Sequence, residues 1–179
     1  MIGDNLVWGV TIVFVGCSAV LDGLTRRIPN WLTVSGFLAG ILVHAALGGL
    51  HSALTAMEGA GLGLAILLPL VLLRALGAGD WKLMGALGAL VGPTMLWFVL
   101  VASVMVAGLM AAFLVVRAGR VWQTFHNMGL IIMGFFTFGL RAHPEISLDN
   151  PDALKLPFGV AAAVGTLICF VAAHWHLGI

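Results

Sequence analysis

Two aspartates border long apolar stretches of the sequence, and their setting could support hydrolysis. Asp22 follows the first apolar stretch, and Asp80 precedes the fourth. Ionisable side chains at membrane depth are costly and are by default candidates for function. Two carboxylates held close together cannot both ionise cheaply, so they share a proton and titrate as a pair. One could act as general base on a water while the other, protonated, polarises a carbonyl. That is the chemistry of peptide hydrolysis without a covalent intermediate.

Other catalytic patterns are missing from the sequence. It contains no Gly-x-Ser-x-Gly, no His-Glu-x-x-His and no phosphate-binding Gly-Lys-Ser/Thr. Cys17 and Cys169 lie far apart in apolar stretches and form no Cys-x-x-Cys pair. We therefore interpret both cysteines as small buried side chains and expect neither a metal site nor a cofactor.

Each aspartate also has a purely structural interpretation. Asp80 could cap a helix after a Gly-Ala-Gly turn. Asp22 could be an interfacial carboxylate paired with Arg26. Gly77 and Gly79 favour function, because a backbone without side chains can adopt positive φ and admit a substrate strand. The matching depth of the two aspartates favours the catalytic hypothesis for the pair.

The elements that must position these carboxylates are membrane helices. Of 179 residues, 61% are hydrophobic and only 8% are charged, whereas a soluble domain carries about 25% charged residues. The fold class is therefore an all-α polytopic membrane protein in contact with lipid. The net charge of +1 without a basic run gives no reason to expect nucleic acid. The first five residues contain no lysine or arginine, so the first apolar stretch should remain as a span.

We predict about six transmembrane helices in a single domain, because a helix needs about 20 apolar residues to cross the hydrocarbon core. The long apolar stretch after Asp80 exceeds one span, and Gly92-Pro93-Thr94 should break it in two. The predicted spans are residues 5–21, 31–50, 53–73, 81–92, 94–116 and 156–175.

The basic residues support this division. With both termini outside, all eight lie on the cytoplasmic side, as the positive-inside rule requires. The eight are Arg26, Arg27, Arg74, Lys82, Arg117, Arg120, Arg141 and Lys155. A single span over 83–116 would move Arg117 and Arg120 to the other face. Asp22 and Asp80 then share the cytoplasmic end, whereas Glu58 enters the third span from the opposite face.

Residues 117–155 form the predicted cytoplasmic loop. Its segment 121–140 begins with polar residues, and its apolar part is too short to span. We favour an interfacial helix there over a re-entrant segment. Within the spans, glycines four residues apart either let helices approach closely or reflect ordinary membrane-helix composition. These pairs are Gly36 and Gly40, Gly59 and Gly63, and Gly88 and Gly92.

The aspartate segments resemble the signatures of a known family. Residues 77–88, GAGDWKLMGALG, are similar to the Gly-x-Gly-Asp motif, with its trailing lysine, of type IV prepilin peptidases. Residues 21–33 resemble the second signature, an aspartate followed by basic residues and Ile-Pro-Asn. Residues 156–165, LPFGVAAAVG, resemble the carboxy-terminal Pro-Phe/Tyr-Gly segment. The short chain resembles the tight-adherence (Flp pilus) branch.

The resemblance implies that Asp22 and Asp80 are the catalytic pair of a membrane aspartic peptidase. It implies removal of the short basic leader from prepilins or pseudopilins, usually after a glycine. The reaction would take place at the cytoplasmic face of a bacterial or archaeal inner membrane. Longer members carry a cysteine-rich zinc-binding loop and methylate the new amino terminus. This chain lacks that loop, so methylation is not expected.

Six neighbours of the pair are expected to shape the site or bind substrate: Gly77, Gly79, Lys82, Arg26, Pro29 and Asn30. Pro29 should turn the chain into the second span, with Asn30 as its N-cap. Lys82 could either favour the ionised form of Asp80 or extend to lipid head groups. Trp81 stands where a smaller aliphatic residue is common in the family.

Two other functional classes are compatible with parts of the sequence. Intramembrane acids also serve as proton relays, so the chain could be a proton- or ion-coupled transporter. The two aspartates cluster at one face, however, and no charged residue continues a path from them. A non-catalytic pilus-assembly subunit, with glycine-rich helices that hold partners, is the other alternative.

The six-span topology is open to a labelling experiment. Asn5 precedes the first span and Asp149 lies in the predicted cytoplasmic loop. Cysteines introduced at these positions should differ in accessibility to a membrane-impermeant reagent in intact cells, with position 5 labelled and position 149 protected. Equal labelling would rule out the six-span arrangement.

Overall fold

The protein is described by a computed structural model over residues 2–73, 76–119, 121, 122, 124, 126, 129 and 156–176. Over these residues it is all-α, without strands. The long helices are α1 (Ile2–Thr25), α2 (Asn30–Leu72), α3 (Ala78–Arg117) and α5 (Phe158–His176). All four are long and apolar enough to cross a membrane. The prediction of an all-α, multi-pass membrane protein is therefore confirmed.

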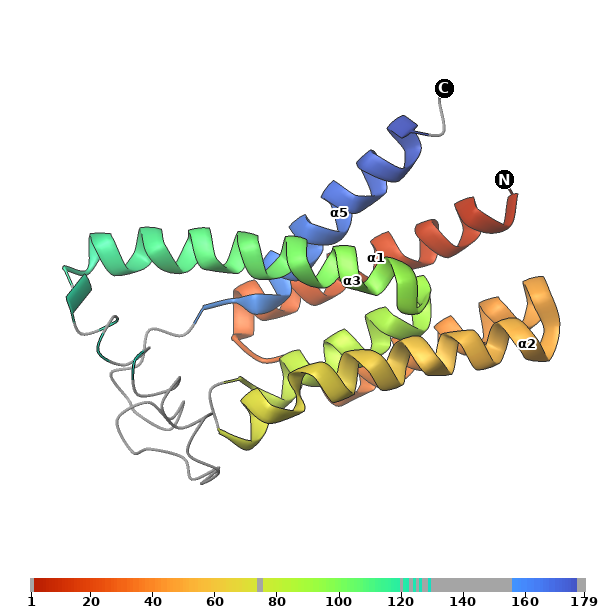
Figure 1. The fold of residues 1–179 in the computed structure, drawn as a ribbon, viewed down its shortest axis with the longest axis horizontal. Coiled ribbons are helices and arrows are strands. Elements are labelled where there is room, and N and C mark those ends of the chain that lie inside the picture. The colour runs from red at the N-terminus through yellow and green to blue at the C-terminus, as the bar shows by residue number, and fades with distance from the viewer. Residues whose placement is uncertain are drawn as a thin grey trace.

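Glycines interrupt the two longest helices. In α2, Gly48 and Gly49 have non-helical backbone angles, and in α3 Gly92 does. Gly49 and Gly92 have φ of 66° and 76°, which glycine adopts without the penalty that a Cβ would bring. Figure 1 shows that α2 and α3 each turn back on themselves at these positions. The predicted break at Gly92 is confirmed, whereas the count of six spans stays a prediction.

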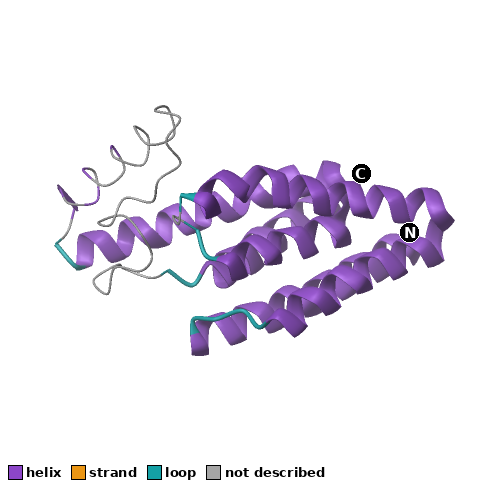
Figure 2. Cartoon of the chain, turned by 90° about the horizontal axis from the view of Figure 1, so that it is seen from below, coloured by secondary structure: helices purple, strands orange, loops and turns teal. Residues whose placement is uncertain are grey.

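The helix ends that carry the aspartates gather at one end of the bundle. Figures 1 and 2 show the carboxyl end of α1 and the amino ends of α2, α3 and α5 there. The amino end of α1 and the carboxyl end of α5 lie at the opposite end. Asp22 near the end of α1 and Asp80 near the start of α3 therefore belong to the same end of the molecule.

The first half of α3 is the centre of the bundle. Every residue from 83 to 90 is buried, as expected for a helix that is apolar on all sides. The first half of α2 reaches it closely, since a Cβ on Gly40 would lie 2.6 Å from the backbone of Ala89. Gly36 lies against the ring of Phe14 on α1. Asp80 thus begins a helix segment that its neighbours hold on several sides.

The second half of α2 meets α3 at backbone contact. A Cβ on Gly59 would collide with the carbonyl of Gly88, and one on Gly63 would lie 2.6 Å from the carbonyl oxygen of Met84. Close helix approach is therefore confirmed for these glycines. A Cβ on Gly92 would have no neighbour within 4 Å, so this glycine permits the turn in α3 and not a close helix contact.

A histidine side chain forms a hydrogen bond to a backbone carbonyl near the break in α3. Residue 90 lies just before Gly92, where the helical pattern of hydrogen bonds is interrupted. His44 of α2 places Nε2 2.9 Å from the carbonyl oxygen of Leu90. This contact requires the proton on Nε2, because the carbonyl can only accept. It ties α2 to α3 at the end of the bundle away from the aspartates.

Part of the predicted organisation lies outside the described residues. This applies to most of the loop 117–155 and to its predicted interfacial helix, 121–140. It applies also to four of the basic residues used for the topology, Arg74, Arg120, Arg141 and Lys155.

The glycine contact between α2 and α3 yields a stability prediction. Gly59→Ala inserts a Cβ against the Gly88 carbonyl, and overpacking of this kind costs about 1–3 kcal/mol. We expect a lower melting temperature in detergent. Gly61→Ala is the matched control on the same helix, because nothing lies within 4 Å of its built Cβ. Equal melting temperatures for the two variants would contradict the contact.

Candidate active site

Asp22 is held from a helix that is distant in sequence. It lies in the last turn of α1 and is only 5% exposed. Its Oδ2 accepts a 2.7 Å hydrogen bond from the backbone N–H of Gly159, 137 residues away in the chain. Gly159 is the second residue of α5, and the partial positive charge at a helix amino terminus favours a carboxylate.

Only glycine allows this approach of α5 to Asp22. A Cβ on Gly159 would lie 2.9 Å from the Cβ of Asp22 and 3.2 Å from the carbonyl oxygen of Ser18. The sequence alone did not predict a role for Gly159. The only signal was its place in the Pro-Phe-Gly segment at 157–159.

Asp80 stabilises the start of its own helix. Gly77 is the N-cap of α3, and Asp80 is the third helical residue. The Asp80 carboxylate accepts a hydrogen bond from the backbone N–H of Gly77, which is one half of a capping box. Asp80 is therefore not the N-cap considered from the sequence. It reaches back from the first turn, where a short acidic side chain can still meet the free amide groups.

The two glycines before Asp80 do not use their conformational freedom. Gly77 has φ −69° and ψ 142°, and the positive φ values among the described glycines belong to residues 49, 92 and 119. The expectation of positive φ here is wrong. A Cβ on Gly79 would instead lie 3.4 Å from that of Ile28. The small residue leaves room for the segment between α1 and α2.

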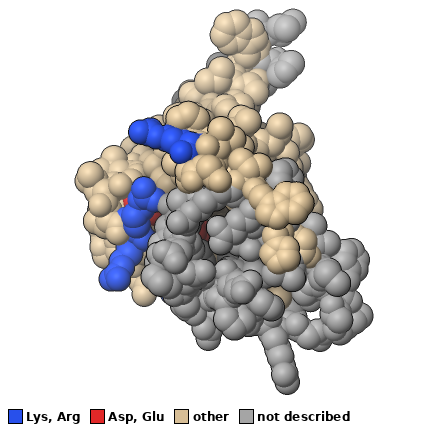
Figure 3. Space-filling model, turned by 90° about the vertical axis from the view of Figure 1, so that its left-hand side faces the viewer, with Lys and Arg blue, Asp and Glu red and all other residues tan. Residues whose placement is uncertain are grey.

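One cavity of about 360 Å³ joins the two carboxylates. Its lining residues are Asp22, Arg26, Arg27, Ile28, Gly77, Gly79, Asp80 and Leu156. The charges of Asp22 and Asp80 are close enough to repel each other. Figure 3 shows basic side chains over this end of the molecule, with acidic atoms visible behind them. The structure thus brings together the two aspartates that were singled out from the sequence.

Arg26 turns the chain at the end of α1. It has φ 53°, a left-handed conformation that is uncommon for residues other than glycine. Its N–H donates a 2.8 Å hydrogen bond to the carbonyl of Asp22, as in the αL termination of helices. The positive charge of Arg26 also attracts the Asp22 carboxylate. Arg26 therefore lies near enough to act on Asp22, as the structural interpretation requires, and both residues line the cavity.

The start of α2 differs from the prediction in one respect. Pro29 is the N-cap, with extended backbone angles and no side-chain cap. Its carbonyl accepts from the amides of Leu32 and Thr33. Asn30 is therefore the first helical residue and not the predicted N-cap. Its Oδ1 accepts a 2.9 Å hydrogen bond from Nζ of Lys82 instead, which joins the two signature segments directly.

Trp81 anchors the turn that carries Asp80. Its indole N–H donates a 2.7 Å hydrogen bond to the carbonyl of Leu64 in the second half of α2, and its ring packs against the buried core. A smaller aliphatic residue could not make this bond. The residue that departs from the family's usual pattern therefore supports the fold beside Asp80.

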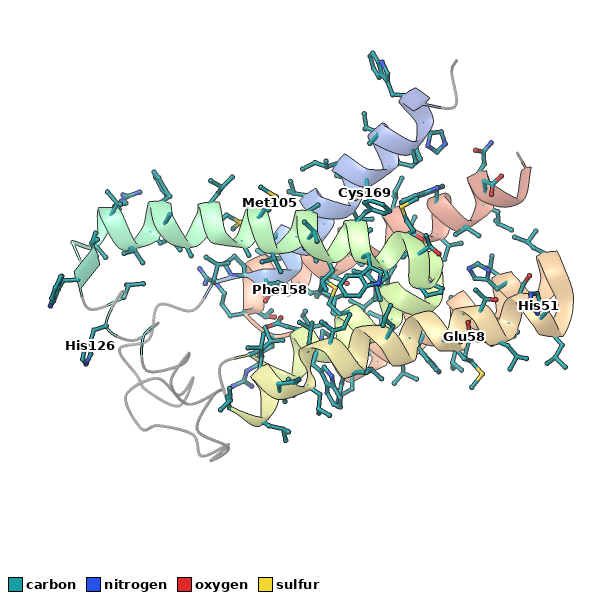
Figure 4. All side chains as sticks on the ribbon, in the orientation of Figure 1. His51, Glu58, Met105, His126, Phe158 and Cys169 are labelled. Carbon is teal, nitrogen blue, oxygen red and sulfur yellow. The ribbon has the colours of Figure 1, made fainter. Side chains whose placement is uncertain are left out.

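Glu58 does not join the pair. Its side chain is exposed, and Figure 4 shows it on α2 on the same side of the bundle as His51, away from Phe158 at the start of α5. The predicted separation of Glu58 from the two aspartates is confirmed. Among the described residues, no group of three or more His, Cys, Asp or Glu side chains could hold a metal ion.

A comparison with known families matches the part of the chain that carries both aspartates. Residues 9–116, more than half of the chain, match the type IV leader peptidase family. The match contains both aspartates and ends before α5. No curated protein and no solved structure matches the chain.

The Trp81 hydrogen bond predicts a measurable contribution to stability. Trp81→Phe keeps an aromatic ring but leaves the Leu64 carbonyl without this donor. We expect a loss of about 1 kcal/mol in the free energy of unfolding. Trp97→Phe is the matched control, because that side chain is 51% exposed and should change little. Equal melting curves for both variants would show that the bond contributes nothing.

Proposed function

Because the chain belongs to the type IV leader peptidase family, we propose that it is an aspartic endopeptidase whose catalytic pair is Asp22 and Asp80. Family membership supports the activity of a leader peptidase. The aspartic mechanism is supported by one observation above all, the lining of a single cavity by both carboxylates. The remaining lining includes two glycines, which add no side chains to the space beside the acids.

The proposed reaction needs one carboxylate to be ionised and one to be protonated. The ionised carboxylate takes a proton from a water, whose oxygen then bonds to the scissile carbonyl carbon. The protonated carboxyl donates its proton to the carbonyl oxygen. When the resulting diol collapses, one hydroxyl proton returns to that carboxyl, and the first carboxyl passes the proton that it took from the water to the leaving nitrogen. The pair ends as it began, and no bond forms between enzyme and peptide because the nucleophile is water.

The proposed substrates are prepilins or pseudopilins of the Flp type, cleaved after their short basic leaders. Support for the cytoplasmic face comes from Arg26 and Arg27, which line the cavity, since basic residues concentrate on that side of membrane proteins. Such a substrate has a polar leader followed by an apolar segment, and its scissile bond would meet the cavity where the helices begin. We propose an inner-membrane location with both termini outside, and cleavage without methylation.

A transporter is less well supported. A proton path would need ionisable groups that continue from the pair across the bundle. The other described acids are Asp4, at the opposite end of α1, and Glu58, which is exposed. Neither extends a chain of groups from the cavity.

Substitution of the aspartates tests the proposal. Asp22→Asn and Asp80→Asn keep the side-chain shape and remove the exchange of protons. Each should lower cleavage of a co-expressed prepilin roughly a thousandfold or more, and the double variant should lose little further, because residues that act as a unit are not additive. The measurement is the fraction processed at matched enzyme abundance in the membrane.

Glu58→Gln is the matched control, since it also removes an acid from a membrane helix. It should process prepilin within about twofold of the wild type, because Glu58 lies away from the cavity and distant sites act independently. Retained activity in either aspartate variant would refute the pair and the mechanism.

A further inference from the structure

The two carboxylates of the cavity have unequal surroundings. Asp22 accepts a hydrogen bond from Gly159 on another helix and is attracted by the charge of Arg26. Asp80 accepts a hydrogen bond from Gly77 of its own helix, and the charge that acts on it is the negative charge of Asp22. Both acids lie near helix amino termini, so the helix dipole alone does not distinguish them.

The other positively charged side chains near the cavity do not change this difference between the surroundings of Asp22 and Asp80. Lys82 is two residues from Asp80, yet its Nζ donates to Asn30. Arg27 lines the cavity together with Arg26. Leu156, two residues before α5, also lines the cavity and has no titratable side chain. Each acid has a backbone donor, but Asp22 also has the positive charge of Arg26, so its ionised form is the better stabilised of the two.

We propose that Gly159 and Arg26 keep Asp22 ionised as the general base, which leaves the shared proton on Asp80. This assignment rests on the proposed peptidase function and gives each aspartate one role in the reaction. Asp22 takes the proton of the attacking water and later passes it to the leaving nitrogen. Asp80 protonates the carbonyl oxygen and recovers its proton when the diol collapses. Gly159 acts through Asp22 and is a positioning residue.

The geometry of Gly159 makes the assignment testable. Gly159→Ala retains the backbone N–H, but its Cβ would lie 2.9 Å from the Cβ of Asp22 and 3.0 Å from Oδ2. The amino end of α5 must therefore move away, and the hydrogen bond to Asp22 lengthens or breaks. The ionised form of Asp22 is then less stable, and a higher pH is needed to generate the base.

The test measures kcat and KM against pH with a peptide that spans the leader junction and the purified enzyme in lipid vesicles. For Gly159→Ala we expect the acidic limb of the kcat profile to move up by about one pH unit, the size of a lost hydrogen bond to a charged group. Activity should recover at higher pH, with KM little changed. Arg26→Gln should move the same limb in the same direction by a smaller amount, because Arg26 is exposed.

Two control variants separate this role from a general loosening of the fold. Gly23→Ala places a Cβ 3.9 Å from Val160, an ordinary contact next to Asp22, and should leave the profile unchanged. Gly165→Ala inserts a Cβ 2.6 Å from the backbone of Ser103, farther along α5. It should lower the melting temperature without moving the acidic limb.

The outcomes are distinct. An unmoved limb in an active Gly159→Ala enzyme overturns the proposal. If that variant does not fold, the Arg26→Gln profile decides, and an unmoved limb there overturns it as well. Absence of cleavage by the wild-type enzyme, or activity without Asp22 or Asp80, would instead refute the proposed function itself.

Discussion

Holding two carboxylates at one end of an apolar helix bundle is costly, and much of the structure offsets that cost. Removal of a charge from water is unfavourable unless donors or opposite charges replace the water. Asp22 finds its donor at the amino end of α5, and Asp80 finds one at the amino end of α3. Helix amino termini have amide groups without intrahelical partners. The same groups that need an acceptor at each helix start therefore stabilise the acids that the chemistry requires.

Backbone contact between helices is the second requirement. Apolar helices gain little from hydrophobic association in lipid, so they rely on close packing. Gly59 and Gly88 provide it between α2 and α3, and Gly159 provides it between α5 and Asp22. The first half of α3 is buried along residues 83–90. Asp80 is thereby fixed at the end of a segment with little freedom to tilt, which keeps it in the cavity with Asp22.

Residues near the pair form hydrogen bonds that hold neighbouring helices together. Lys82 donates to Asn30, and Trp81 donates to the carbonyl of Leu64. Both bonds tie the start of α3 to α2, one at each side of the turn that carries Asp80. A substitution at these positions would therefore alter the cavity by moving a helix, even without contact between the side chain and the peptide.

The sequence by itself determined the membrane class, the two aspartates and their common end of the bundle. Apolar stretches and the distribution of charge report which segments lipid can accept, and an acid at the edge of such a stretch is conspicuous because burial is costly. The break at Gly92 and the close contact of Gly59 were predictable for the same reason, since glycine and proline act on the local backbone.

Only the tertiary structure decided which group each side chain would meet. The N-cap of α2 is Pro29, and the side chain of Asn30 accepts a hydrogen bond from Lys82, 52 residues away. Gly77 has a negative φ, and Gly79 packs against Ile28 in the segment between α1 and α2. The donor to Asp22 comes from α5, far along the chain. Hydrogen bonds between distant segments depend on how helices pack in three dimensions, and no local pattern of residues encodes that arrangement.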